Sequence, residues 1–293
     1  MLKVTLMSKK FAVFILTHGR AHKQDTYRTL RKAGYTGKIY LIVDNEDKQQ
    51  DDYIKNYGSQ VIIFDKQAAS EITDAGDNFK KRNSVLYARN ACIEIAQNLG
   101  LDYFWELDDD YGSWRWRIDN AKKFLGAGVN VKSLDAILLA MMEFMEESNI
   151  DCIAFAQGGD YIGGSGSNVF KKHSEGKFLR KVMNSFLVNT KKPFKFIGRM
   201  NDDVNTYVVH GKKGLVFMTL PRLMLNQSET QKNSGGLTEM YLELGTYVKS
   251  FYTVMMAPYC TTIKEMGVSH KRLHHRIDWN KAVPKIVSEN YKR

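Results

Sequence analysis

The sequence predicts an α/β fold: a mostly parallel central sheet flanked by helices, in one continuous domain. Apolar runs of strand length recur along the first half, and segments of helical periodicity separate them. Strand, helix and strand in succession are typical of a parallel sheet covered by helices. The 293 residues suit one large domain, since neither an internal repeat nor a low-complexity linker divides them.

The first half supplies four strands and the helices between them. Continuous apolar runs are typical of strands buried on both faces of a sheet. Glycines close two of the helical segments, as expected of helix ends. The expected elements are strands at residues 11–16, 38–43, 60–64 and 104–107, and helices at about 23–33, ending at Gly34, and at 84–99, capped by Asn83 or Ser84 and ending at Gly100.

The second half has weaker patterns. Ser133 is expected to cap a helix whose apolar residues repeat at helical spacing. A Gly-rich stretch at 157–167 predicts a mobile loop on the acceptor side. Strands are expected at 151–156 and 214–220, an apolar run at 194–200, a helix at 239–250, and a basic, histidine-rich tail after 265.

Composition limits the function classes. With 43 basic and 32 acidic residues, the net charge is +11, which favours a polyanionic partner, although a basic protein can also simply be a soluble one. No run of apolar residues is long enough to span a membrane, and no signal peptide is evident, so no membrane partner is expected. Cys92, Cys152 and Cys260 are far apart, as expected of reduced core thiols in a cytoplasmic protein.

Three acids follow the fourth strand. Alternate side chains of a strand share a face, so Asp108 and Asp110 are expected to point the same way and to hold Mn²⁺ or Mg²⁺. Such a cation binds a diphosphate, and Asp109 is assigned to the same bound nucleotide. The alternative is an acidic turn that caps the next element.

Ligands of parallel sheets bind at the carboxyl ends of the strands. The loop after the first strand, Thr17, His18, Gly19 and Arg20, is therefore expected to approach the nucleoside of a donor. Asp44, at the end of the second strand, is placed to accept hydrogen bonds from a base or ribose. A helix cap is the alternative for Asp44.

Transfer of a group to a hydroxyl needs a base. Asp203 is our first choice and Asp202 the second, with an acidic helix cap as the alternative for both. A direct displacement with one base would invert the transferred carbon. For a third metal ligand we expect His270, with His274 or His275 as alternatives, unless these histidines only contact phosphates.

Taken together, the chain resembles glycosyltransferases of the GT-A fold. Within them it is similar to the TET-associated glycosyltransferases and the bacteriophage enzymes that glycosylate hydroxymethylated pyrimidines in DNA, such as hydroxymethylcytosine. The likeness covers most of the chain and is carried by residues 17–20, 27–37, 42–46, 87–90, 107–110, 201–203 and 231–238.

The resemblance implies a nucleotide-sugar donor, UDP-glucose first, with Mn²⁺ or Mg²⁺, a DNA acceptor, and Arg89 near the donor. It also implies a donor half at about 10–125, an acceptor half at 126–293, and the host cell cytoplasm as the location of a phage-encoded enzyme. A GT-A enzyme acting on a glycan, lipid or protein, and a nucleotidyltransferase, stay as alternatives. A purely DNA-binding protein is disfavoured because acidic strand ends repel a phosphate backbone.

Overall fold

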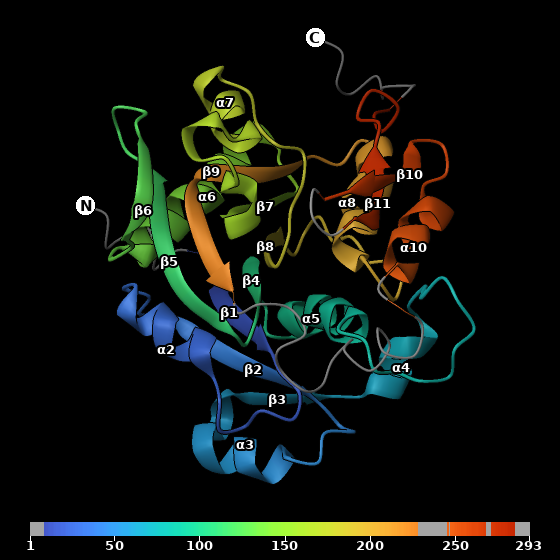
Figure 1. Cartoon of the computed structure of the whole chain (residues 1–293). Coiled ribbons are helices and arrows are strands. Elements are labelled where there is room, and N and C mark those ends of the chain that lie inside the picture. Colours follow the sequence, from blue (N-terminus) through green and yellow to red (C-terminus); the bar gives the residue numbers. More distant parts are fainter. Residues whose placement is uncertain (1–8, 228–244, 246, 268–270, 285–293) are drawn as a thin grey trace.

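The computed structural model describes residues 9–227, 245, 247–267 and 271–284. One nine-stranded sheet runs through this part of the chain in the order β3-β2-β1-β4-β8-β7-β9-β5-β6 (Figure 1). The first four strands in this order are mutually parallel, as is the β7–β9 pair, whereas β8, β5 and β6 run antiparallel to their neighbours. The predicted α/β fold is therefore confirmed. The strands are β1 (Phe11–Leu16), β2 (Lys38–Asp44), β3 (Val61–Phe64), β4 (Tyr103–Asp108), β5 (Tyr111–Ile118), β6 (Phe124–Asn130), β7 (Cys152–Gln157), β8 (Ser185–Asn189) and β9 (Phe217–Gln227).

Each face of the sheet has its own hydrophobic core. Alternate residues of β1 serve the two cores: Val13 and Ile15 enter one, and Ala12 and Phe14 the other. The first core packs against α2, α3 and α6, and the second against α4, α5 and α8. Strands covered on both faces explain why these segments are continuous apolar runs. The helices are α2 (Asp25–Lys32), α3 (Gln50–Tyr57), α4 (Lys66–Glu71), α5 (Leu86–Asn98), α6 (Leu134–Ser148), α7 (Asn168–Ser174), α8 (Asp202–Lys212) and α10 (Val248–Met256), with 3-10 turns at Gly58–Gln60, Gly158–Tyr161 and Gly164–Gly166.

Glycine ends α2 and α5 as predicted. Gly34 has φ +87° and lies so close to the start of α6 that an added Cβ would be 2.3 Å from the carbonyl oxygen of Lys132. Gly100 follows α5 with φ +63°. Ser133 does stand at the N-cap of α6, but its side chain makes no capping hydrogen bond.

The second half departs from the sequence expectations in several places. The 194–200 run is not a strand; its Phe194 and Phe196 pack against each other with ring centroids 5.4 Å apart. The expected strand at 214–220 begins at Phe217 and continues to Gln227. The Gly-rich stretch forms two 3-10 turns, the first held by a capping box between Gln157 and Asp160. Most of the helix expected at 239–250 lies outside the described residues.

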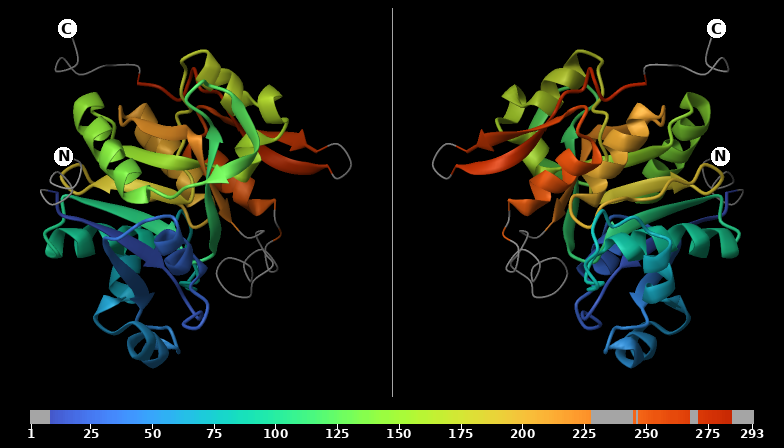
Figure 2. Two further views of the ribbon diagram at one scale, coloured as in Figure 1. Left: turned by 90° about the vertical axis from the view of Figure 1, so that its left-hand side faces the viewer. Right: turned by 90° about the vertical axis from the view of Figure 1, so that its right-hand side faces the viewer.

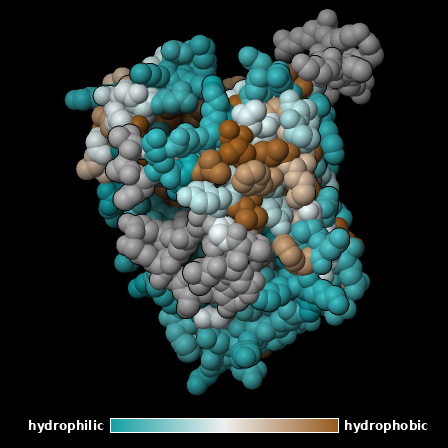
Figure 3. Space-filling model, turned by 45° about the vertical axis from the view of Figure 1, so that its right-hand side comes forward, coloured by the Kyte–Doolittle hydropathy of each residue, from teal (hydrophilic) through white to brown (hydrophobic). Residues whose placement is uncertain are grey.

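A smaller unit follows the sheet. The β10–β11 hairpin, formed by β10 (Thr261–Met266) and β11 (Arg272–Ile277), packs against α10 and projects from the body (Figure 2). On this side the surface carries a hydrophobic patch (Figure 3). Helix α10 buries Tyr252 but leaves Phe251 and Met255 about half exposed, so it packs through one face. None of the helices in the described part of the chain has the length and apolarity required to span a membrane.

Candidate active site

The carboxyl end of β4 carries the densest group of acids. Glu106 and Asp108 share one face of the strand, as their spacing of two requires, and this face packs against α5. Glu106 is fully buried and Asp108 is 22% exposed. Burying carboxylates is costly unless they are paired, and α5 supplies the partner.

Arg89 of α5 is that partner. Its guanidinium lies 2.7 Å from Glu106 and 3.4 Å from Asp108, and its Nε lies 2.7 Å from Asp202 at the start of α8. The ring of Phe186 stacks on it, with its centroid 4.7 Å away. One buried cation therefore joins the end of β4 to the first turn of α8.

Several acids at the end of β4 and at the start of α8 have raised pKa values. Burial raises the pKa of Glu106 to about 8. Burial, together with the charge of Asp202, raises the pKa of Asp203 to about 7. Burial and the neighbouring Asp108 and Asp109 raise the pKa of Asp110 to about 6. These carboxylates crowd one another, and the site has an excess of negative charge.

Asp109 points the other way, towards the loop after β1. One of its oxygens accepts a hydrogen bond from Thr17 Oγ1 at 2.7 Å, and the other accepts one from Arg20 Nη1 at 2.6 Å. Tyr53 of α3 completes this group: its hydroxyl lies 2.8 Å from Thr17 Oγ1 and accepts from the Arg20 backbone amide at 2.8 Å. Asp109 is buried and fixes the shape of the loop.

His18 and Asp44 lie beside this loop. His18 Nδ1 is 2.7 Å from Asp44 Oδ2, and Lys66 Nζ is 3.3 Å from Asp44 Oδ1. The hydrogen bond to Asp44 raises the pKa of His18 despite partial burial. Asp44 also accepts from the Glu46 backbone amide at 3.1 Å, so it shapes a turn and does not cap a helix. Half of the His18 side chain is exposed, whereas Asp44 is buried.

A family model described as TET-Associated Glycosyltransferase matches residues 11–236, which include every strand of the large sheet. The chain belongs to the TET-associated glycosyltransferase family. It is therefore a glycosyltransferase, and the resemblance to this family that the sequence motifs indicated is confirmed.

Solved structures resemble this TET-associated glycosyltransferase at low sequence identity, and no curated protein matches its sequence. Glucosyl-3-phosphoglycerate synthase from Mycobacterium tuberculosis, with Mn²⁺, UDP and phosphoglyceric acid, has a TM-score of 0.46 and 8% identity over 94% of this chain and 89% of its own. The mannosyltransferase PcManGT from Pyrobaculum calidifontis, with GDP-Man and Mn²⁺, has a TM-score of 0.47 and 10% identity over 85% and 73%. S. aureus TarS 1-349 with UDP has a TM-score of 0.43 and 13% identity over 75% and 61%.

Of the residues expected as a third metal ligand, the structure describes the alternatives but not the first choice. His270 lies outside the described residues. His275, one of the alternatives, has its Nδ1 3.2 Å from Asn201 Nδ2 at the N-cap of α8, and burial lowers its pKa to about 4. Within the described ranges, no group of three or more His, Cys, Asp or Glu side chains is arranged to hold a metal ion.

The donor atoms of Asp108 and Asp110 nevertheless fit a hard divalent cation. Both supply carboxylate oxygens, which Mg²⁺ and Mn²⁺ prefer, and Mg²⁺ commonly takes one or two protein carboxylates together with substrate phosphates. Burial, and then the charges of Asp108 and Asp109, raise the pKa of Asp110 to about 6, as expected where carboxylates lie close together.

Sequence reasoning did not identify Glu106, Tyr53 and Lys66 as parts of this candidate site. Glu106 had a detectable signal, because an acid two residues before Asp108 in an apolar run must share its face of the strand. Tyr53 and Lys66 had none, because ordinary amphipathic helices contain such residues. Their roles appear only where α3 and α4 meet the ends of β1 and β2.

Proposed function

We propose that this TET-associated glycosyltransferase moves a sugar, glucose first, from a UDP-sugar to the hydroxyl of a hydroxymethylated pyrimidine in DNA, with Mn²⁺ or Mg²⁺. The observation that carries the proposal is the link through Arg89. It brings the acids at the end of β4, suited to a cation and diphosphate, next to the acids that begin α8, suited to deprotonating an acceptor.

Asp108 and Asp110 would hold the cation. When bound, it would stabilise the charge that develops on the departing diphosphate. The loop of Thr17, His18, Gly19 and Arg20 would line the nucleoside. Buried Asp44 would hold the half-exposed His18 beside it, and His18 would contact the base or ribose. Asp109 would position this loop, since both of its carboxylate oxygens accept hydrogen bonds from it.

Arg89 would act through the acids and not by touching the donor, because its guanidinium is 4% exposed and engaged by three carboxylates. It is a positioning residue in this proposal. One Asp202 oxygen pairs with Arg89. Asp203 is therefore the better base: it is half-buried, and its pKa of about 7 suits proton transfer near neutral pH. A single displacement with this base inverts the anomeric carbon.

DNA is the acceptor that the net charge of +11 favours over a neutral glycan or lipid. In this proposal one domain contains a donor half, about residues 10–125, and an acceptor half, about 126–293. The enzyme would work in the cytoplasm, where both DNA and UDP-sugars are present.

The test incubates the full chain with UDP-glucose, Mn²⁺ and duplexes that contain 5-hydroxymethylcytosine, 5-hydroxymethyluracil or neither. Mass spectrometry of the digested nucleosides then detects an added hexose. We expect transfer to one hydroxymethylated duplex, none to the unmodified duplex, and loss of transfer when a chelator removes the metal. Release of UDP with every duplex unglycosylated, and transfer instead to a glycan, lipid or protein acceptor, would exclude DNA.

A further inference from the structure

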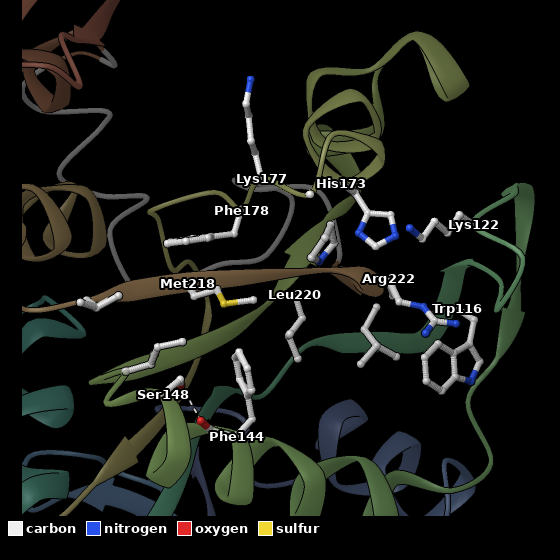
Figure 4. Close-up of a pocket in the computed structure, with 15 residues that line it drawn as sticks. Trp116, Lys122, Phe144, Ser148, His173, Lys177, Phe178, Met218, Leu220 and Arg222 are labelled. Atoms are coloured by element: carbon white, nitrogen blue, oxygen red, sulfur yellow. Dashed lines mark hydrogen bonds between the residues drawn. The ribbon is translucent and has the colours of Figure 1, made fainter.

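A cavity lies away from these acids. It has a volume of about 620 Å³ and runs along β9, between α6 and the segment that follows α7 (Figure 4). Ile150 and Val216, which precede β7 and β9, line it, so it reaches the amino ends of two strands whose carboxyl ends face the acids. Trp116, at its other end, is five residues along β5 from Tyr111, or roughly 17 Å at the rise of a strand. The cavity is distinct from the proposed donor site.

Most of the cavity wall is apolar. Phe144 and Phe178 are 41% and 46% exposed, and both line the cavity, so they form part of one contiguous apolar wall. Met218 and Leu220 lie between them on β9 (Figure 4). None of the described lining residues is an Asp, Glu, Asn or Gln. With few polar side chains in the wall besides the cations, Ser148 and His173, the cavity suits a largely apolar body.

Cations gather at one end of the cavity. Lys122, His173 and Arg222 point towards one another beside Trp116 (Figure 4). His173 is close enough to the other two that their charges, after burial, lower its pKa. Arg222 contacts neutral groups: the Asn120 side chain at 2.5 Å, the Ile118 carbonyl at 3.4 Å and the Trp116 ring. In the part of the chain that the structure describes, no carboxylate pairs with any of the three.

We propose that this cavity is a binding site for a small amphipathic anion, with an aliphatic or aryl body and one carboxylate or phosphate head group. The body would cover Phe144, Phe178 and the apolar face of β9, and the head group would accept hydrogen bonds from Arg222 and Lys122. Charge-assisted hydrogen bonds of this kind are the strong ones. The volume falls within the range of small-molecule pockets.

The test is calorimetric titration of the full chain with dodecanoate and with dodecyltrimethylammonium, which has the same chain and the opposite charge. We expect saturable dodecanoate binding with a Kd below about 100 μM, and binding of the cationic probe at least about tenfold weaker. The double variant Arg222→Gln with Lys122→Gln should weaken dodecanoate binding by about tenfold or more. Lys123→Gln, an adjacent lysine outside the lining, is the matched control and should leave it unchanged.

Leu220→Trp, which would fill the cavity, is a second variant that should prevent dodecanoate binding. Its melting temperature reports whether it folds. Absence of saturable dodecanoate binding, equal binding of the two probes, or unchanged affinity in the double variant would each overturn the proposal. A DNA competition gives the last outcome. If unmodified duplex DNA displaced dodecanoate, and Lys122→Gln and Lys123→Gln weakened DNA binding equally, the cations would serve a phosphate backbone and the proposal would be wrong.

Discussion

Replacing Arg89 by Met tests the centre of the proposed site. The side chain is 4% exposed and neutralises Glu106, Asp108 and Asp202 at 2.7, 3.4 and 2.7 Å. Removing one partner of a buried ion pair costs about 3–5 kcal/mol, because the remaining charge stays desolvated. Met retains much of the apolar stem, so the loss measures charge more than volume. We expect a loss of this size in the free energy of unfolding at pH 8.5.

The loss should depend on pH. The folded-state pKa of Glu106 is already about 8 and that of Asp203 about 7, above the value of about 4 for unfolded acids. Removing the guanidinium raises them further. An acid whose pKa is raised by folding opposes folding increasingly as pH rises from its unfolded towards its folded pKa. The Arg89→Met penalty should therefore be clearly smaller at pH 5.

Urea unfolding followed by circular dichroism at the two pH values measures both effects, provided that the transition is a single cooperative one. Arg82→Met, which removes an exposed pair with Glu46, is the control and should change stability little. Glu106→Gln should restore part of the loss when added to Arg89→Met. An equal penalty at both pH values, or no rescue by Glu106→Gln, would refute the charge argument and assign Arg89 a packing role.

Three further predictions follow from the described geometry. Asp203→Asn should lower kcat by about 100-fold or more, in line with general-base catalysis. It should also remove the rise of kcat/KM with pH around 7 that loss of a proton from this acid produces. An unchanged pH–rate profile would exclude Asp203 as the base. Asp110→Asn should raise the Mn²⁺ concentration for half-maximal activity by about tenfold or more, whereas Asp119→Asn, in the distant β5–β6 turn, should not; equal effects would contradict the metal assignment. Gly34→Ala should lower the free energy of unfolding by more than about 1 kcal/mol, because its φ is +87° and the new Cβ would meet Lys132. Gly158→Ala, with open space around it, should change the free energy of unfolding far less. Equal urea midpoints for the two variants would show that the α2–α6 contact rearranges to accept the new Cβ.

The fold was predictable where burial is two-sided. Strands β1, β2 and β4 lie inside the sheet between two cores, so their residues are apolar in succession. The predicted strand at 214–220 ended just before Pro221, which has no amide hydrogen for a strand ladder. In the structure the pairing with β7 shifts register at that point, from Leu220 opposite Phe155 to Met224 opposite Ala156, and the strand continues. Strand β5 was missed because its tryptophans alternate with arginines over a short segment, and Trp114 is core.

The site was predictable only as separate strand ends. Topology places the ends of β1, β2 and β4 at one edge, so a local pattern suffices to group Thr17, Asp44 and Asp108. The contact between Arg89 and Asp202 is different, because these residues are far apart in sequence and no local pattern couples them. The resemblance implied only that Arg89 lies near the donor; in the structure three carboxylates surround its guanidinium.

The acids around Arg89 outnumber the cations that can neutralise them. Arg89 offsets Glu106 and the nearest acids, and the N-terminal end of α8, where backbone amides point outward, favours Asp202 and Asp203 in its first turn. Burial, and then the charge of the neighbouring Asp202, raises the pKa of Asp203 to about 7. An isolated surface aspartate, ionised far below neutral pH, would be a much weaker base. The buried acids therefore lower the stability of the fold. The same crowding and burial give one carboxylate a pKa near neutral pH, which is what a general base requires.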